Sequence, residues 1–194
     1  MASNNQTFIL ASRSPRRIQF LKELGVKFQS EPSPVEEVIQ PDKTPEENAL
    51  QVARDKALWA AEQHKGAFVL GADTLVSLNG DIIGKPVDHE DARRILKKLS
   101  GREHQVITGV AIINPNNELF EQAVTSKVKI KPLTDEEISR YIRSGEPMDK
   151  AGAYAIQGKG SSLVASYQGS YSNIVGLPIE TVEDLLKQAG YVRI

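Results

Sequence analysis

One stretch of the sequence decides the fold: residues 8–17 read FILASRSPRR. Its first four residues, Phe8 to Ala11, are apolar, and a short apolar run of this kind predicts a buried strand. Ser14 is a favourable N-cap and Pro15 a favourable first helical residue. Apolar side chains then recur at helical spacing until Gly25, a typical helix stop. A strand, a tight turn and a helix in this order predict an α/β fold.

The same alternation of apolar runs and helical patterns continues along the chain. Capping boxes at Thr44 and Thr134 mark two further helix starts. The patterns predict helices over residues 44–64, 89–99, 134–144 and 178–190, and strands over residues 68–72, 82–83, 106–113 and 124–130. Residues 29–43 are expected to form a loop, and residues 152–176 a Gly- and Ser-rich segment with short strands. Since the chain has no internal repeat and no low-complexity linker, we predict a single domain over residues 1–194.

The composition excludes several classes of protein. Lys and Arg total 24, Asp and Glu total 25, and the formal net charge is -1, which does not suit a protein that mainly wraps nucleic acid. The absence of cysteine excludes a disulfide framework, a thiolate zinc site and a cysteine nucleophile, and it fits a reducing compartment. The start, MASNNQTFIL, carries no signal-peptide pattern, and no run approaches the ~20 apolar residues of a membrane span. We therefore expect a cytoplasmic protein without a membrane or a stable nucleic-acid partner.

The turn at residues 12–17 concentrates groups that bind anions. Ser12 offers a hydroxyl, and Arg13, Arg16 and Arg17 offer three guanidinium groups next to a helix start. A helix N-terminus attracts anions, and guanidinium forks match phosphate oxygens. Positive charge in the first helical turn opposes the helix dipole unless an anion is present. This conflict favours a phosphate site, and the alternative is a solvated basic turn.

Two charged residues further along the chain extend this interpretation. Lys56 lies three residues after Ala53 and four before Ala60, so its stem runs beside a stripe of small residues. Its ammonium either reaches solvent or is directed toward an anion at the sheet. Asp73 directly follows the apolar run 68–72, and ligands of α/β proteins collect beyond the carboxyl ends of strands. Asp73 there can hold Mg²⁺ or orient a water, or it is an ordinary turn residue.

Residues 149–158, DKAGAYAIQG, form the other dense segment. Its small residues allow a close approach of the backbone to a ligand. Gln157 offers both a donor and an acceptor, as recognition of a base edge requires. The alternative is a Gly-rich turn with a structural pair of Asp149 and Lys150.

Several well-known sites are excluded. Residues 80–86 lack the spacer and the Ser or Thr of a P-loop, and residues 158–163, GKGSSL, lack the third glycine of a dinucleotide fingerprint. The chain has no nucleophile elbow of a serine hydrolase. The histidines show no metal-ligand spacing; they are His64, His89 and His104.

Taken in order, the motifs resemble the Maf family. They are residues 11–17 (ASRSPRR), 71–74 (GADT), 84–86 (GKP), 100–109 (SGREHQVITG), 149–158 (DKAGAYAIQG) and 169–178 (GSYSNIVGLP). The resemblance implies a fold like that of inosine triphosphate pyrophosphatase, with an elongated mixed β-sheet flanked by helices and two lobes around a cleft. It also implies hydrolysis of nucleoside triphosphates to the monophosphate and pyrophosphate with a divalent metal cation, Mg²⁺ or Mn²⁺. The subfamily with this Arg, Thr and Gln pattern acts on dTTP, UTP and related pyrimidine nucleotides.

The resemblance also implies a role for individual residues. Asp73 matches the catalytic aspartate of the family, and Glu37 falls at its second acidic position, so both are expected to bind the metal. Arg16, Thr74 and Gln157 match positions that set specificity. The polar and basic residues of the phosphate site are matched by Ser12, Arg17, Lys56 and Lys85. One departure is Ala155, where many members have glycine.

The expected reaction is attack of water at the α-phosphorus, with Asp73 as general base or, with Glu37, as holder of the metal and the water. Such a reaction depends on positioning and charge neutralisation, which a chain without cysteine can provide. The role would be house-cleaning of the nucleotide pool. Two alternatives stay open: a pyrophosphatase for 7-methyl-GTP or another modified nucleotide, and a nucleotide-binding regulator of septum formation. A homodimer is expected from the resemblance.

Overall fold

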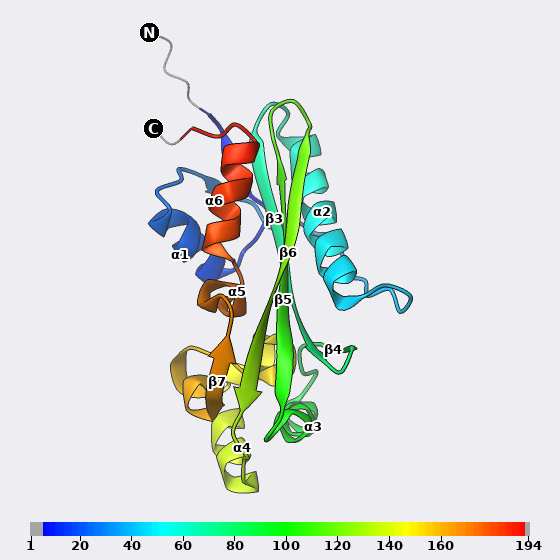
Figure 1. Cartoon of the computed structure of the whole chain (residues 1–194), viewed down its shortest axis with the longest axis vertical. Helices are drawn as coiled ribbons and strands as arrows, with labels where there is room; N and C mark the ends of the chain where they lie inside the picture. Colours follow the sequence, from blue (N-terminus) through cyan, green and yellow to red (C-terminus); the bar gives the residue numbers. More distant parts are fainter. Residues whose placement is uncertain (1–5, 193–194) are drawn as a thin grey trace. The chain divides into compact units, whose positions relative to one another are not determined.

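The protein is built on one mixed β-sheet, seen here in a computed structural model that describes residues 6–192. Residues 1–5 and 193–194 lie outside the described residues. The predicted absence of a signal peptide concerns the first of these two segments. The sheet has seven strands in the order β2-β1-β3-β5-β6-β7, and β4 pairs with β3 (Figure 1). The strands are β1 Phe8–Leu10, β2 Gln29–Ser30, β3 Phe68–Leu78, β4 Asp81–Ile83, β5 Glu103–Ile113, β6 Leu119–Ile130 and β7 Val164–Gln168.

Parallel and antiparallel pairs occur in the same sheet. Strand β1 is parallel to both β2 and β3, with Leu10 opposite Leu70 in the second pair. Strand β4 is antiparallel to β3, and β7 is antiparallel to β6. The predicted mixed α/β sheet is therefore confirmed.

The predicted helices begin within one residue of their expected starts, whereas α5 was not predicted. They are α1 Pro15–Glu23, α2 Pro45–Gln63, α3 His89–Leu99, α4 Asp135–Ile142, α5 Tyr171–Val175 and α6 Ile179–Gln188. Both predicted capping boxes are formed, at Thr44 with Glu47 and at Thr134 with Glu137. Ser14 is the N-cap residue of α1 as predicted, although its side chain makes no capping hydrogen bond. Of the helices that the structure describes, none is long and apolar enough to cross a membrane.

The chain divides into two compact units. The first comprises residues 1–73, 108–124 and 176–194, and the second comprises residues 74–107 and 125–175. Strands β3, β5 and β6 contribute residues to both units. The prediction of one domain over residues 1–194, like that of two lobes around a cleft, stays a prediction.

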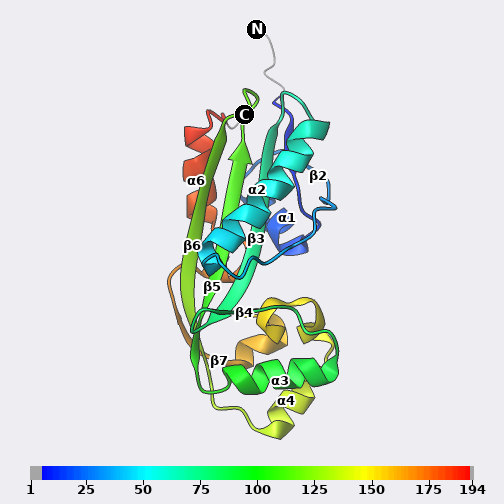
Figure 2. The same cartoon turned by 90° about the vertical axis from the view of Figure 1, so that its right-hand side faces the viewer.

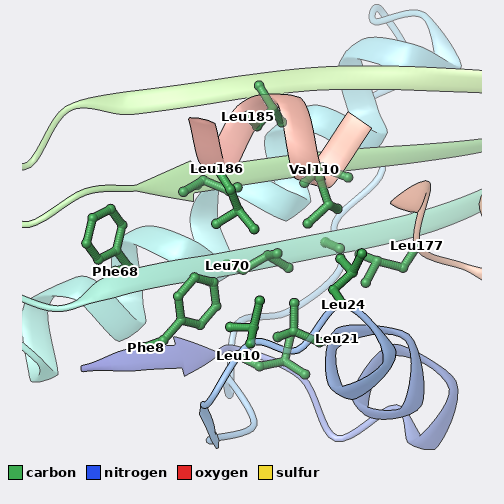
Figure 3. Close-up of a cluster of buried hydrophobic side chains, with 14 of the residues drawn as sticks. Phe8, Leu10, Leu21, Leu24, Phe68, Leu70, Val110, Leu177, Leu185 and Leu186 are labelled. Carbon is green, nitrogen blue, oxygen red and sulfur yellow. The ribbon is translucent and has the colours of Figure 1, made fainter. Parts of the chain in front are cut away.

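In the first unit, helices cover both faces of the sheet (Figures 1 and 2). Alternate strand residues point to opposite faces. Leu10 and Leu70 pack with Leu21 of α1 and Leu186 of α6 in one buried cluster (Figure 3). On the other face, Ile9 and its neighbours pack against the small residues of α2, which include Ala53, Ala57 and Ala60.

Two glycines bring α2 very close to the strands. A Cβ atom at Gly71 of β3 would stand 2.2 Å from the carbonyl oxygen of Ala53. A Cβ atom at Gly109 of β5 would stand 2.3 Å from the carbonyl oxygen of Ala49. Because real side chains never approach a carbonyl so closely, any residue larger than glycine would push the helix outward. The close packing places the α2 side chains next to the middle of β3.

The second unit contains α3, α4, α5, β4, β7 and three short 3₁₀ segments, η1 Glu146–Asp149, η2 Ala151–Ala153 and η3 Gly158–Leu163. The prediction of several short strands within residues 152–176 is wrong, since only β7 is a strand there. Gly152 and Gly158 adopt left-handed φ angles of 72° and 64°, which turn the chain before a strand can extend. The loop prediction for residues 29–43 also missed β2, whose Gln29 and Ser30 pair with β1. That pairing joins residues distant in sequence, so local composition carries no sign of it.

Candidate functional site

Strand β3 carries Asp73 in a buried position. The sequence predicted that the strand stops at Ala72 and that Asp73 follows its end, and this prediction is wrong. Strand β3 continues to Leu78, because its second half pairs with β4, with Val76 opposite Ile83. This pairing with the strand that follows directly along the chain overrides the polar residues in the middle of β3. Asp73 is only 4% exposed.

A buried ammonium group joins the two predicted acidic residues. Lys56 of α2 donates from Nζ to Oδ1 of Asp73 at 2.8 Å and to Oε1 of Glu37 at 2.7 Å. Lys56 is 7% exposed, so its stem lies against the small-residue stripe and its charge points inward rather than to solvent. Oδ2 of Asp73 is buried and finds no hydrogen-bond partner among the described residues. A buried carboxylate oxygen without a donor is costly unless a ligand supplies one.

Glu37 is held near the helix by a residue that sequence reasoning missed. It lies between β2 and α2, and its side chain is 44% exposed. Asn48 of α2, 1% exposed, accepts from the backbone N–H of Gln40 at 2.7 Å and donates to the carbonyl oxygens of Gln40, Lys43 and Thr44. The available signal was a polar residue next to Ala49, on the small-residue side of the helix. Asn48 thereby fixes the chain that follows Glu37.

The predicted phosphate turn is anchored to the same strand. Arg17 donates from Nε to the carbonyl oxygen of Gly176 and from Nη1 to that of Ala72, both at 2.9 Å. It also donates to Oγ of Ser12 at 3.4 Å. Burial lowers the pKa of Arg17, while the charges of Asp73 and Glu37 raise it. Arg17 therefore braces the residue before Asp73 and contributes positive potential to the two carboxylates.

The remaining groups of this turn offer further donors. Ser12 is 8% exposed, and its Oγ accepts from the backbone N–H of Ser14 at 3.2 Å. Arg16 is half-buried, and its Nε is buried without a hydrogen-bond partner in the part of the chain that the structure describes. Arg13 is exposed. One unit thus holds six predicted site residues: Ser12, Arg16, Arg17, Glu37, Lys56 and Asp73.

The other three predicted residues belong to the second unit. Thr74 directly follows Asp73 in β3. Lys85 is exposed after β4, and Gln157 is exposed just before η3. Near Gln157, Asp149 and Lys150 form the structural ion pair that the sequence left as an alternative.

The histidines do not form a site. Among the described residues, no group of three or more His, Cys, Asp or Glu side chains is arranged to hold a metal ion. His104 is 2% exposed, and its Nε2 lies 2.7 Å from the hydroxyl of Tyr154. Burial lowers the pKa of His104 to about 4, so the ring is neutral at physiological pH.

Comparison with known proteins gives a consistent family. The family model described as Maf-like protein matches residues 7–189. A dTTP/UTP pyrophosphatase of Dictyoglomus thermophilum is 50% identical, covering 94% of this chain and 96% of the relative. A dTTP/UTP pyrophosphatase of Geobacter sulfurreducens is 50% identical, covering 91% and 94%. Among solved structures, a HAM1 protein from Coxiella burnetii is similar in fold, with a TM-score of 0.50 at 17% identity over 94% of this chain and 99% of that chain. The resemblance carried by the motifs is confirmed, and the chain belongs to the Maf family.

Proposed function

We propose that this chain is a nucleoside triphosphate pyrophosphatase that hydrolyses dTTP and UTP to the monophosphate and pyrophosphate. The observation that carries the proposal is Oδ2 of Asp73, a buried acceptor without a partner among the described residues, beside the Lys56 ammonium. Membership of the Maf family and the names of the relatives support the same reaction. A protein that only binds nucleotides needs cations beside the phosphates. A buried carboxylate there would repel the phosphates, so its presence favours an enzyme in which the carboxylate binds a metal ion or a water.

The donor set at this position fits a divalent cation. Asp73 and Glu37 supply carboxylate oxygens, the ligands that Mg²⁺ and Mn²⁺ prefer. Mg²⁺ is commonly bound by one or two carboxylates together with substrate phosphate oxygens, so a larger protein cluster is not required. We assign Asp73 and Glu37 as the residues that would hold the cation. When bound, it would supply charge neutralisation and Lewis acidity at the phosphate oxygens.

Each of the proposed site residues has its own role in the reaction. Asp73 accepts a proton through Oδ2 from the water that attacks the α-phosphorus. A bond forms between the water oxygen and the α-phosphorus, and the bond from that phosphorus to the oxygen bridging to the β-phosphate breaks. Pyrophosphate leaves with the bonding electron pair. The cations that neutralise the triphosphate are Arg16, Arg17, Lys56 and Lys85, and Ser12 donates a hydrogen bond to it.

Three residues recognise the nucleotide. Gln157 presents a donor and an acceptor to the edge of the base, and Thr74 binds the base or the ribose. Arg16, whose buried Nε has no acceptor among the described residues, contacts the substrate from the first turn of α1. Such paired hydrogen bonds discriminate strongly, because a base that cannot form them leaves polar groups unpaired.

Location and assembly are further proposals. We place the enzyme in the cytoplasm, where nucleoside triphosphates are made and used, as a house-cleaning enzyme of the nucleotide pool. We propose a homodimer, and light scattering after size exclusion would measure twice the mass of one chain. A mass of a single chain at micromolar concentration would contradict the dimer.

Substitution Asp73→Asn tests the proposed role of the carboxylate. Asparagine keeps the size of the side chain but cannot accept the proton, so we expect kcat for dTTP to fall by about 10²–10⁴-fold. The Kd for dTTP should change less than about threefold, since the cations that bind phosphate remain. Pyrophosphate release with Mg²⁺ and nucleotide binding by calorimetry measure the two quantities.

A matched control is Asp184→Asn, because Asp184 is an exposed aspartate of α6 paired with Lys187. This variant should keep the turnover of the unmodified chain. The proposed role of Asp73 fails if Asp73→Asn hydrolyses dTTP at the same rate as the control. A panel of triphosphates that includes 7-methyl-GTP identifies the preferred base in the same assay.

A further inference from the structure

A glutamate in the second unit holds the loop that carries Gln157. We call residues 155–160 the Gln157 loop. Glu146, the first residue of η1, accepts from the backbone N–H of Gly160 through Oε1 at 2.9 Å and from that of Lys159 through Oε2 at 3.0 Å. Both oxygens of one carboxylate therefore bind the backbone just after Gln157. Hydrogen bonds to a charged acceptor are about twice as strong as neutral ones.

A tyrosine extends the same network to the other side of Gln157. The hydroxyl of Tyr141, in α4, donates to Oε1 of Glu146 at 3.0 Å and accepts from the backbone N–H of Ala155 at 3.1 Å. Tyr141 is 5% exposed, and burial raises its pKa, so the hydroxyl stays protonated as the donor. The loop is thus tied at Ala155 before Gln157 and at Lys159 and Gly160 after it.

The glycines of the loop are required by this arrangement. Gly158 has a φ of 64°, and a Cβ atom there would stand 2.9 Å from Oε2 of Glu146. A Cβ atom at Gly160 would stand 2.3 Å from the carbonyl oxygen of Ala155 and 2.7 Å from the hydroxyl of Tyr141. The Gly-Lys-Gly sequence, which matches no phosphate-binding motif, therefore serves to close the backbone around a carboxylate.

The side chain of Gln157 depends on this backbone for its position. It is exposed, and no hydrogen bond ties its amide to the described part of the chain. An exposed side chain points reproducibly only if its backbone is fixed. Recognition by two hydrogen bonds requires placement within about 0.5 Å.

We propose that Glu146 and Tyr141 are positioning residues that set the base selectivity of the enzyme by fixing the Gln157 loop. The inference rests on the proposed function, in which Gln157 binds the base. Neither residue touches the nucleotide. Their effect is on the choice between thymine or uracil and other bases, and not on the chemistry at the α-phosphorus.

The test compares selectivity in Glu146→Gln with that of the unmodified chain. The amide keeps the size of the side chain, but its NH₂ group cannot accept a hydrogen bond from the backbone. We expect the ratio of kcat/KM for dTTP to that for dCTP to fall about tenfold. The change should come from a higher KM for dTTP, with kcat within about threefold, because the reacting groups are untouched. Hydrogen exchange at Lys159 and Gly160 should become faster.

Glu136→Gln is the matched control, because Glu136 is an exposed glutamate of α4 with a surface ion pair to Arg140. It should leave the selectivity ratio and the exchange rates unchanged. Tyr141→Phe keeps the buried ring and removes only the hydroxyl, so it tests the inference even if Glu146→Gln does not fold. We expect this variant to lower the ratio about threefold.

Gln157→Ala separates the inference from the proposed function. If Gln157→Ala lowers the ratio while Glu146→Gln and Tyr141→Phe keep it within twofold of the unmodified chain, the positioning role is wrong and the function of Gln157 stands. If Gln157→Ala leaves the ratio unchanged, the assignment of base recognition to Gln157 fails, and the inference fails with it.

Discussion

At the scale of the residue, Lys56 shows what a sequence pattern can and cannot predict. Its spacing from Ala53 and Ala60 correctly placed the stem beside the small-residue stripe, because helical periodicity is local. The direction of the ammonium stayed open, since it depends on carboxylates 17 and 19 residues away in sequence. The structure shows that it joins Glu37 and Asp73.

Substitution Lys56→Met tests how much this buried charge contributes to the stability of the fold. Methionine fills similar space but leaves Asp73 and Glu37 without their common partner. Removing one member of a buried pair costs about 3 kcal/mol when one partner is partly exposed, as Glu37 is. For a chain of this length we expect the melting temperature to fall by roughly 6–12 °C.

The control for Lys56→Met is Lys65→Met, which changes an exposed lysine just after α2. Its melting temperature should stay within about 2 °C of the unmodified chain. Added Mn²⁺ should stabilise Lys56→Met more than it stabilises the unmodified chain, because a cation can replace the lost charge. Equal melting temperatures for Lys56→Met and Lys65→Met would contradict the account of Lys56.

At the scale of the element, starts of helices were predictable and ends of strands were not. Thr44 and Thr134 cap their helices through contacts within four residues, so the sequence contains the whole signal. Strand β3 extends past Asp73 because of β4, and β2 exists because of β1. Pairing between strands decided the structure in both of these places: β4 follows β3 directly along the chain, whereas β2 joins β1 from a more distant segment. The motif that points to Asp73 does not depend on the strand boundary, since residue type and order are independent of it.

Substitution Gly109→Ala tests the packing of α2 on the sheet. The new methyl group would stand 2.3 Å from the carbonyl oxygen of Ala49, and backbone cannot rotate away as a side chain can. Overpacking of this kind costs about 3 kcal/mol, and the shift of α2 also displaces Lys56, so turnover should fall. Urea denaturation measures the free energy of unfolding.

Gly84→Ala is the comparison for Gly109→Ala, because a Cβ atom at Gly84 meets nothing within 4 Å in the described structure and Gly84 has no left-handed φ. Its free energy of unfolding should change by less than about 1 kcal/mol. If Gly109→Ala is as stable as Gly84→Ala, α2 does not lie as close to β5 as the structure has it.

At the scale of the whole molecule, a net charge of -1 conceals a local arrangement of opposite charges. Two carboxylates and the cations around them suit a small polyanion with a metal ion rather than a nucleic acid. The family could be predicted from the sequence because the motifs occur in a fixed order along nearly the entire chain. The sequence could not predict the network of Glu146, Tyr141 and the Gln157 loop, since that network is built from backbone groups that no residue type reveals.

The central claim is that water attacks the α-phosphorus, and the most direct test is hydrolysis of dTTP by the unmodified chain in ¹⁸O-labelled water with Mg²⁺. Mass spectrometry of the products locates the label. We predict one ¹⁸O atom in each dTMP formed, an equal amount of unlabelled pyrophosphate, and no orthophosphate as a primary product. Label in pyrophosphate, or release of dTDP with orthophosphate, would contradict the account.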